Sequence, residues 1–432
     1  MNDSSVGIGV AGLGTVGAAV LDLLVAHDAR IAGRAGHSLH LSGVSARDRS
    51  RDRGVDLSGT AWHDDPVALA EDAGTDVFVE LIGGTEGPAR ESVEAALRAG
   101  KRVVTANKAL LAHHGAGLAA IAESAPGAAL HYEAAVAGGI PAIKALREGL
   151  AANAVTRVSG ILNGTCNYIL TEMEATGAAF GDVLAEAQRL GYAEADPEAD
   201  VGGFDAAHKL ALLAAIAFGQ SVDFASVEIA GIEAVAAEDI LFAGELGYRI
   251  RLLGVAERTP EGIAQRLRPC LTPKGSPLGK IDGVTNAVLI EGDPVGSVML
   301  TGPGAGGGAT ASAVVADVID AVRGNHPPTF GLGAGAGLSA PRPVARGTDH
   351  GAYYLRLSLQ DQPGALAEIA AALGEQGVSI HRMRQYDHDG AVAPVAIVTH
   401  ETGEAALEAA KARISELGVC LASPISMRIE SV

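Results

Sequence analysis

Cysteine is scarce in this chain of 432 residues, which holds only Cys166, Cys270 and Cys420 and no CxxC pair. Neither a disulfide framework nor a structural zinc site can be derived from three isolated cysteines. Basic residues are also in deficit, 32 against 51 acidic ones, which gives a formal net charge of −19. Phosphate backbones and anionic membrane surfaces repel so acidic a protein, so we expect neither nucleic acid nor a membrane as a partner.

Long apolar runs are absent as well, because no stretch reaches the length of about 18 residues that a membrane-spanning helix needs. The N-terminal segment MNDSSVGIGVAGLG lacks a basic region followed by an apolar run, so neither a secretory signal nor a transit peptide is expected. We therefore expect a cytoplasmic protein. The chain does contain 48% hydrophobic residues, enough for a sizeable core. At about 150 residues per domain, its length suggests roughly three domains.

Short β-type runs alternate with helical patterns over the first 135 residues. Strands are expected at residues 6–11, 39–45, 76–82, 102–105 and 129–133, and helices at 15–26, 66–73, 88–99 and 115–124. This alternation predicts an α/β fold, a doubly wound parallel sheet of the Rossmann type with helices on both faces. We assign residues 1–135 to this dinucleotide-binding domain, and a helix within residues 305–325 is expected to return to it.

The remainder divides into a middle domain, a linker and a tail. Residues 136–304 mix helical patterns (142–149, 169–175, 180–190 and 204–218) with β-type runs at 284–291 and 296–301. They predict an α+β domain for substrate binding and dimerisation. Residues 326–350 are rich in proline and glycine and are expected to form a linker. Residues 351–432 follow a βαββαβ order, with strands at 354–359, 378–386, 392–399 and 424–429, which predicts a compact unit of its own.

The sequence GLGTVG is a G-x-G-x-x-G motif placed between the first strand and the first helix. Gly12 permits the tight turn, Gly14 lets the backbone approach a pyrophosphate, and Gly17 lets helix and strand pack closely. The helix N-terminus, with Thr15 and Val16, offers N–H groups and a positive dipole end to the anion. These five residues are therefore predicted to bind a dinucleotide cofactor.

The end of the second strand indicates which dinucleotide binds. An NAD site usually has a carboxylate there, whereas here Arg47 comes first and Asp48 follows. A guanidinium suits the additional 2′-phosphate of NADP, so NADP is favoured, and NAD remains possible because a shift of one residue restores the acid. The alternative interpretation is a solvated charged loop over residues 47–53.

Three further segments carry chemistry. LIGGT, with Gly84 and Thr85, ends a strand where a nicotinamide ribose would lie, and TANK places Lys108 at the carboxyl edge of the sheet. Asp205 and Lys209 are four residues apart, so on a helix they share a face. Taken alone, that pair is more typical of a surface salt bridge than of an active site.

The segments GLGTVG, LIGGT, TANK, EAAVAGGIP, GILNGTCNYI, GYAEADPEADVGGFDAAHK and GPGAGGGATASA together resemble homoserine dehydrogenase, in the family's order up to about residue 322. The tail, with LSLQDQPGALAEIAAAL, resembles an ACT domain, a small amino-acid-sensing module. The resemblance implies an enzyme that interconverts L-aspartate 4-semialdehyde and L-homoserine with a nicotinamide cofactor. This reaction lies on the route to threonine, methionine and isoleucine.

The resemblance also implies roles for individual residues. Lys209 matches the proton donor, Lys108 matches a second lysine between cofactor and substrate, and Gly191 and Gly304 fall within segments that touch the cofactor. The substrate-binding acids are Glu194, Asp205 and Asp200. The residue types suit the chemistry, because hydride addition to an aldehyde develops negative charge on oxygen, which an ammonium group stabilises and protonates.

The segment EAAVAGGIP lies between the first two domains. The resemblance implies that it binds a monovalent cation, typically sodium, through Glu133 and the main-chain carbonyls of Val136, Gly138 and Ile140. Hard oxygen ligands suit a hard cation. The alternative is an ordinary hinge. Nearby, Cys166 is expected to be a packed thiol rather than a nucleophile, because hydride transfer needs no covalent intermediate.

In the tail, Asp361, Pro363 and Gly364 form the turn from the first strand to the first helix. In ACT domains this turn holds a regulatory amino acid, here threonine by the resemblance, and Gln362 replaces the basic residue often found there. The alternative is a degenerate module kept for oligomerisation, and a homodimer or homotetramer is expected. Two other functions stay open: a dehydrogenase for another amino-acid-derived substrate, and a non-catalytic amino-acid sensor with a vestigial nucleotide fold.

Overall fold

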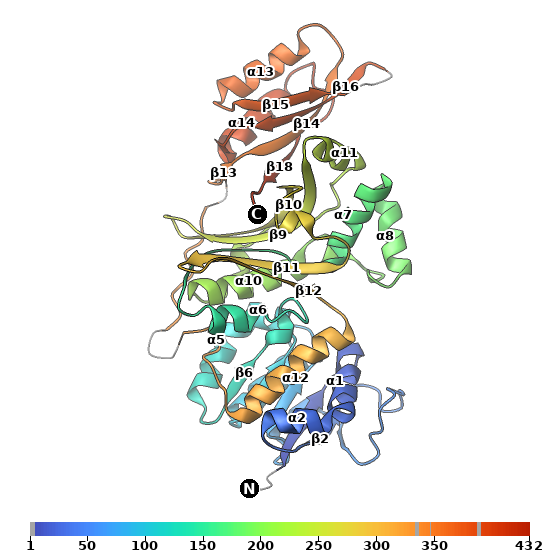
Figure 1. Cartoon of the computed structure of the whole chain (residues 1–432), viewed down its shortest axis with the longest axis vertical. Coiled ribbons are helices and arrows are strands. Elements are labelled where there is room, and N and C mark those ends of the chain that lie inside the picture. Colours follow the sequence, from blue (N-terminus) through green and yellow to red (C-terminus); the bar gives the residue numbers. More distant parts are fainter. Residues whose placement is uncertain (1–4, 333–336, 346, 387–389) are drawn as a thin grey trace.

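The computed structural model describes residues 5–332, 337–345, 347–386 and 390–432. The chain is elongated and stacks three layers along its length (Figure 1). The N-terminal domain occupies one end, the tail occupies the other, and the middle domain lies between them. Residues that the sequence separates widely therefore meet at two boundaries, and the lower one holds the candidate site.

The N-terminal domain is built on a six-stranded parallel sheet with the order β3-β2-β1-β4-β5-β6. Its strands are β1 (Val6–Ala11), β2 (Leu39–Ser45), β3 (Ala61–His63), β4 (Val77–Glu80), β5 (Arg102–Thr105) and β6 (Ala129–His131). The strand order reverses between β1 and β4, where doubly wound folds bind their ligands. The predicted Rossmann-type sheet is confirmed, and β3 adds a short strand that the sequence patterns did not indicate.

Helices cover both faces of this sheet. One face carries α1 (Thr15–Ala26), α2 (Asp28–Ala35) and α12 (Gly307–Arg323), whose apolar side chains share a core with β1 and β2. The other face carries α3 (Pro66–Glu71), α4 (Pro88–Arg98) and α5 (Lys108–Ser124). The helix α12 lies beside α1 although about 280 residues separate them, so the chain comes back to this sheet after the middle domain (Figure 1).

The middle domain has a largely antiparallel sheet with the order β12-β11-β7-β9-β10. Its strands are β7 (Ala154–Ile161), β9 (Tyr248–Arg258), β10 (Ile263–Pro273), β11 (Thr285–Asp293) and β12 (Gly296–Pro303), with the short β8 (Glu228–Ile229) beside β10. Its helices are α6 (Ala142–Lys144), α7 (Gly164–Thr176), α8 (Phe180–Arg189), α9 (Glu198–Val201), α10 (Phe204–Phe218) and α11 (Ala237–Glu245). Most of α10 is buried, so this helix forms the centre of the domain.

The tail has the predicted βαββαβ order: β14 (Tyr353–Gln360), α13 (Ala365–Glu375), β15 (Ile380–Gln385), β16 (Val392–Thr399), α14 (Glu404–Ser415) and β18 (Ile425–Ile429). It has its own apolar core between its sheet and its two helices. Its sheet is not separate, however, because β18 pairs in parallel with β10, where Cys270 lies opposite Arg428. The expected unit of its own therefore continues the sheet of the middle domain into ten strands, with β8 paired beside β10.

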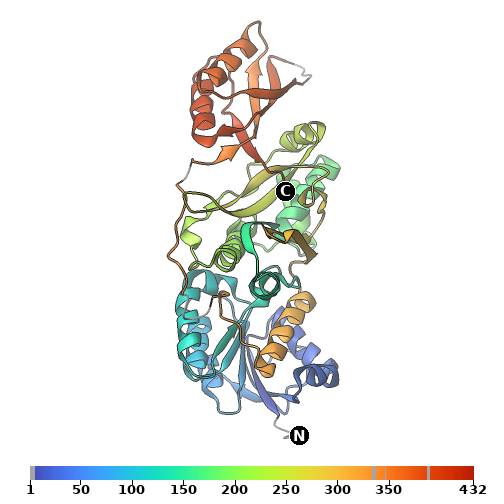
Figure 2. The ribbon, with the colours of Figure 1, turned by 60° about the vertical axis from the view of Figure 1, so that its left-hand side comes forward.

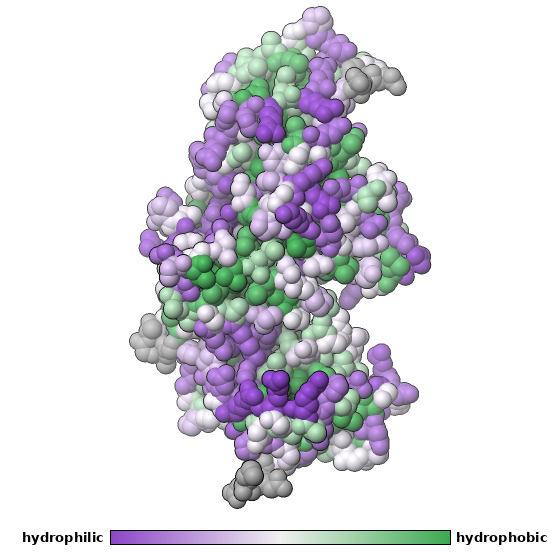
Figure 3. Space-filling model, in the orientation of Figure 1, coloured by the Kyte–Doolittle hydropathy of each residue, from purple (hydrophilic) through white to green (hydrophobic). Residues whose placement is uncertain are grey.

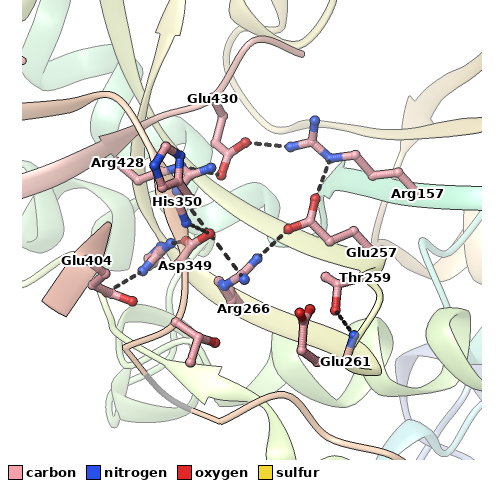
Figure 4. A network of polar contacts seen from close by, with 12 residues as sticks. Arg157, Glu257, Thr259, Glu261, Arg266, Asp349, His350, Glu404, Arg428 and Glu430 are labelled. Carbon is pink, nitrogen blue, oxygen red and sulfur yellow. Dashed lines mark hydrogen bonds and ion pairs between the residues drawn. The ribbon is translucent and has the colours of Figure 1, made fainter. Parts of the chain in front are cut away.

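The segment between α12 and the tail runs along the side of the middle domain (Figure 2). Its backbone is tied down where Ile263 N–H donates to Arg342 O over 2.8 Å. Near its end, the buried Asp349 carboxylate pairs with Arg266 at 3.2 Å and with Arg428 at 2.9 Å (Figure 4). Because Arg266 belongs to β10 and Arg428 to β18, Asp349 connects the linker, the middle domain and the tail through one cluster of charges.

Hydrophilic and hydrophobic residues are mixed over most of the face shown in Figure 3, and the largest group of hydrophobic residues lies across its middle. At that level β12 forms the edge of the large sheet, and Met299 on this strand is 40% exposed. Within the described ranges, no helix combines the length and the apolar character that spanning a membrane requires.

Candidate active site

A cavity of about 670 Å³ lies between the N-terminal and middle domains, at the carboxyl ends of the central strands. It brings together nine residues that the sequence analysis singled out: Val16, Lys108, Gly138, Gly191, Glu194, Asp200, Asp205, Lys209 and Gly304. These residues come from both domains and from segments nearly 300 positions apart. Gly84 and Thr85 lie on the adjacent loop after β4 and do not line the cavity.

The glycine-rich turn has the geometry that each glycine was expected to serve. Gly12 has a φ of +95°, and a Cβ there would stand 2.3 Å from the carbonyl carbon of Leu81. A Cβ on Gly17 would stand 2.0 Å from the oxygen of Gly12, whereas the space in front of Gly14 is open. No side chain caps the N-terminus of α1. Its N–H groups are thus available to a pyrophosphate, and the turn fits a dinucleotide.

A second helix N-terminus faces the same place. The helix α12 begins after Gly306, without a side-chain cap and without an acidic residue in its first turn. A Cβ on Gly307 would stand 3.3 Å from Thr15, so the starts of α12 and α1 almost touch. Two positive dipole ends therefore converge on the cavity mouth. The glycine-rich sequence before α12 was the available signal, although the sequence analysis took only Gly304 from it.

The centre of the cavity is a carboxylate between two lysines. Asp205 and Lys209 lie one turn apart on α10, with Oδ2 at 2.6 Å from Nζ, and Lys108 Nζ approaches Asp205 Oδ1 from the N-terminal domain at 2.9 Å. Lys209 is buried and also donates to Leu162 O over 2.8 Å. The pair is therefore not the surface salt bridge that the spacing alone favoured.

The charges of this cluster depend on each other. Burial alone raises the pKa of the Asp205 carboxyl, but the ammonium groups of Lys209 and Lys108 outweigh it and hold the pKa well below its usual value. Burial lowers the pKa of Lys108, and the neighbouring carboxylates, led by Asp205, outweigh it and raise the pKa. At neutral pH the cluster thus contains an ionised carboxylate and a protonated Lys108.

Asn163 organises the acidic side of the cavity and was missed by the sequence analysis. Its Nδ2 donates to Asp200 Oδ1 at 2.8 Å and to Asp205 Oδ2 at 3.1 Å, while its Oδ1 caps α7 by accepting from Cys166 N–H. An asparagine directly before a helix was the usable signal. The Cys166 thiol is buried and donates to Asp200 O, and burial raises its pKa well above the usual value, so it is the packed thiol that was expected.

Asn286 on β11 also lines the cavity without having been expected there. It is 1% exposed, and its Oδ1 has no hydrogen-bond partner among the described residues. The side chain lies directly against Gly304, where a Cβ would stand 1.9 Å from Nδ2. Only a residue as small as glycine fits at position 304, which explains why the wall of the cavity is backbone at this point.

The loop after β2, which was expected to meet a 2′-phosphate through Arg47, places another arginine, Arg53, at the glycine-rich turn. Arg47 is exposed at the end of β2, as the sequence indicated. Arg53 reaches back to the glycine-rich turn, where its Nε donates to Leu13 O at 3.3 Å, and its guanidinium lies 5.6 Å from the centre of the Trp62 ring. The Asp48 side chain accepts from Ser50 N–H at 2.8 Å, which turns this carboxylate into the loop.

The segment with Glu133, Val136, Gly138 and Ile140 forms the connection between the domains. Both Glu133 carboxylate oxygens accept backbone N–H groups at the start of α6, from Ile143 at 2.9 Å and from Lys144 at 2.8 Å. Burial and the nearby Asp317 raise the pKa of Glu133 to about 7. The turn contains Ala137 at a φ of 56°, a conformation that is uncommon for a residue with a side chain.

The tail has a cavity of about 210 Å³ at the turn between β14 and α13. Asp361 and Gly364 line it, and Pro363 lies between them in the same turn. Gln385 of β15 and the apolar Val395 of β16 close the opposite side. The helix α13, at whose start this cavity lies, is at the opposite end of the molecule from α1 and α12 (Figure 1).

A Rossmann-type sheet with a glycine-rich turn, next to a lysine–carboxylate cluster, defines an oxidoreductase that uses a nicotinamide cofactor. Family models described as homoserine dehydrogenase, its NAD-binding domain and the ACT domain match residues 141–319, 12–133 and 353–419. The homoserine dehydrogenase of Neisseria gonorrhoeae is 43% identical over 435 residues, covering 99% of each chain. The chain belongs to the homoserine dehydrogenase family.

Solved structures agree. A homoserine dehydrogenase from Thiobacillus denitrificans superposes with a TM-score of 0.91 at 42% identity, covering 99% of both chains. A hyperthermophilic archaeal homoserine dehydrogenase in complex with NADPH matches with a TM-score of 0.62 at 28% identity, covering 74% of this chain and 98% of that one.

Proposed function

We propose that the chain reduces L-aspartate 4-semialdehyde to L-homoserine, reversibly, with Lys209 as the proton donor. The observation that supports this assignment is the Asp205 carboxylate held between Lys209 and Lys108 in a cavity that Val16, next to the glycine-rich turn, also lines. A vestigial sensor has no need of two lysines that two different domains bring to one carboxylate.

The residues divide the work of the reaction. When bound, the cofactor supplies a hydride to the aldehyde carbon. As the carbon–oxygen double bond opens, Lys209 Nζ gives a proton to the developing oxyanion, and the second ammonium, on Lys108, stabilises the same charge. Asp205 orients both ammonium groups, and Glu194 takes the ammonium of the amino-acid substrate. In the reverse direction Lys209 accepts the proton, so oxidation is faster at alkaline pH.

One assay tests the function and its alternatives. Purified protein is given L-homoserine with NADP or NAD, with and without L-threonine, and the nicotinamide absorbance is followed. Turnover with homoserine supports the proposal. Turnover only with another amino-acid-derived alcohol would favour the other dehydrogenase, and no turnover by the folded protein with either cofactor would favour the sensor.

NADP is the cofactor that the end of β2 supports best. Arg47 and Arg53 offer two guanidinium groups near the glycine-rich turn, while the Asp48 carboxylate, which would hold a ribose hydroxyl, is engaged by Ser50. The archaeal homoserine dehydrogenase that shares this fold was solved in complex with NADPH. The charged loop over residues 47–53 thus serves the 2′-phosphate rather than being only solvated.

Replacing either arginine should therefore affect the two cofactors unequally. We expect Arg47→Ala and Arg53→Ala to raise KM for NADPH about tenfold each, the size of one charge-assisted contact, and to change KM for NADH little. Steady-state kinetics with both cofactors measure this split. Arg30→Ala, on the distant helix α2, is the matched control. Equal changes for both cofactors would support the solvated-loop interpretation instead.

We further propose that sodium binds at the connection between the domains, held by Glu133 and by the carbonyl groups of Val136, Gly138 and Ile140. Glu133 and Asp317 are two buried carboxylates close together, while the nearby Lys144 ammonium pairs with Asp317 at 3.0 Å. Two carboxylates then face one ammonium, and a bound cation would supply the second positive charge that balances them. The same cation would hold the turn at Ala137. Its role is structural, because no step of the reaction passes through it.

Sodium should then stabilise the protein specifically. Exchanging sodium chloride for choline chloride at equal ionic strength is expected to lower Tm by several degrees in the wild type, as loss of a bound ligand does. In Glu133→Gln the difference between the two salts should shrink. Thermal unfolding in each salt measures both. An identical Tm of the wild type in sodium and choline would contradict the site.

The tail is proposed to bind threonine in the cavity beside Asp361, Pro363 and Gly364 and so to inhibit the enzyme. The supporting observation is that the 210 Å³ cavity has room for a small amino acid. Turnover that threonine leaves unchanged would instead favour a role in assembly. A homodimer or homotetramer stays a prediction, supported by the exposed β12 edge, and so does a cytoplasmic location.

A further inference from the structure

Two central strands of the N-terminal sheet end side by side beneath the cavity. Glu80 is the last residue of β4, Thr105 is the last residue of β5, and the two are paired in register. The loop with LIGGT follows Glu80, and the loop with TANK follows Thr105. Glu80 is 0% exposed and does not line the cavity, so any effect it has on the reaction must act through these loops.

The Glu80 carboxylate binds both loops at once. Its Oε1 accepts the N–H groups of Ile82 at 2.8 Å and Gly83 at 3.0 Å, which fixes the loop after β4. Its Oε2 accepts the Thr105 hydroxyl at 2.5 Å. Thr105 Oγ1 in turn accepts Asn107 N–H at 2.9 Å, which fixes the loop after β5.

Asn107 completes a ring of hydrogen bonds that runs through Glu80 and Thr105, and it connects this ring to Lys108. Its Nδ2 donates to Gly84 O at 2.7 Å, so the two loops are also joined directly. Its Oδ1 caps α5 by accepting Leu110 N–H at 3.0 Å. Lys108 is the first residue of that helix, so the position of its backbone is set by the same hydrogen bonds.

A buried carboxylate is a costly way to join two loops, because its desolvation must be offset by hydrogen bonds that an apolar pair would not need. In return, a carboxylate fixes the relative positions of its hydrogen-bond donors, because its two oxygens accept from defined directions around one group. The ring thus determines how far Lys108 reaches across the cavity towards Asp205.

We propose that Glu80 is a positioning residue that locks the loops after β4 and β5 together and so places the Lys108 ammonium for the reaction. The inference rests on the proposed role of Lys108 and extends it to a residue that touches neither substrate nor cofactor.

Glu80→Gln tests this by a double-mutant cycle with Lys108→Met. Glu80→Gln keeps the shape and one acceptor but presents N–H groups to Thr105. We expect its kcat for homoserine oxidation to fall about tenfold, as a small misplacement of a reacting group does. In the Lys108→Met background the same change should cost less than about twofold, because the group that it positions is already gone. A purely structural role would cost the same factor in both backgrounds.

Three further variants keep the test decisive. Thr105→Val removes the hydroxyl and should reproduce the loss, whereas Thr105→Ser keeps it and should restore wild-type kcat, and this pair decides the question should Glu80→Gln fail to fold. Asp76→Asn, which changes the carboxylate that accepts Gly7 N–H just before β4, at its opposite end, is the matched control and should leave kcat unchanged.

The outcomes separate the two proposals. Unchanged kcat in Glu80→Gln, or losses that multiply fully with Lys108→Met, would overturn the role of Glu80 alone. Unchanged kcat in Lys108→Met itself would overturn the role of the lysine in the proposed function, and that of Glu80 with it.

Discussion

Lys209→Ala is expected to lower kcat by about a hundredfold or more, since a positioned general acid or base contributes on the order of 10²–10⁴. Lys209 Nζ is held by Asp205 and by Leu162 O, and α10 has no second lysine that could take its place. The affinity for the cofactor should survive, because the glycine-rich turn belongs to the other domain. Lys209→Met fills the same space and should show the same loss without leaving a void.

Absorbance assays at saturating substrate measure kcat, and calorimetric titration with NADP measures cofactor binding. His208→Ala is the matched control, since the His208 ring lies 4.4 Å from Phe224 and does not line the cavity. A Lys209 variant that kept more than about a tenth of wild-type kcat, a ΔΔG‡ below about 1.4 kcal/mol, would contradict the assignment.

The sequence predicted well those parts of the fold in which each helix or strand has its own local pattern of apolar and polar residues. Residues 6–11 and 102–105 are buried strands bounded by turn residues, and the observed β1 and β5 have the same limits. The strands β7, β9 and β10 were missed. In β10 the side chains of Gln265 and Arg266 are buried, so no alternation of polar and apolar residues marks the strand.

One of the partners that make such burial tolerable lies far away in the sequence. Arg266 is paired with Glu257 at 2.7 Å and with Asp349 at 3.2 Å, and Asp349 comes from the linker (Figure 4). A pattern within a short window cannot include a partner so distant along the chain. For the same reason the sequence predicted that the linker is only a spacer. In the structure the linker supplies Asp349, whose charge balances the buried Arg266 of β10.

The candidate site shows the same division. The spacing of Asp205 and Lys209 predicted a shared helix face, and this local feature is what the structure has. That Lys108 reaches the same carboxylate follows only from the packing of one domain on another. The place of Asn163 directly before α7 marks it as a helix cap but not as a site residue, and Asn286 carries no motif. Their positions in the site depend on how α7 and β11 pack around the cavity.

The second large effect is expected from Asp205→Asn. In the wild type one carboxylate neutralises two ammonium groups, at 2.6 Å and 2.9 Å, and the variant leaves both without their counterion. We expect kcat/KM for homoserine to fall about a hundredfold, or about 2.7 kcal/mol of transition-state stabilisation. Asp205 also raises the pKa of Lys108, so this pKa falls in the variant and the neutral amine forms at lower pH. Because the reaction needs the Lys108 ammonium, the alkaline limb of the oxidation profile, on which the rate falls as Lys108 loses its proton, should move to lower pH accordingly.

Stability gives an independent measure of the same ion pairs. The pKa of Asp205 in the folded protein lies below its value in the unfolded chain, about 3.9, so its contribution is fully present above that pH and is lost as the pH falls towards the folded value. The gap in Tm between wild type and Asp205→Asn should therefore be wide at pH 7 and close under acid. Glu186→Gln, which breaks an exposed 2.6 Å pair with Arg189, should change neither Tm nor kinetics. An Asp205→Asn profile that keeps its alkaline limb in place would show that the carboxylate serves the fold and not the lysines.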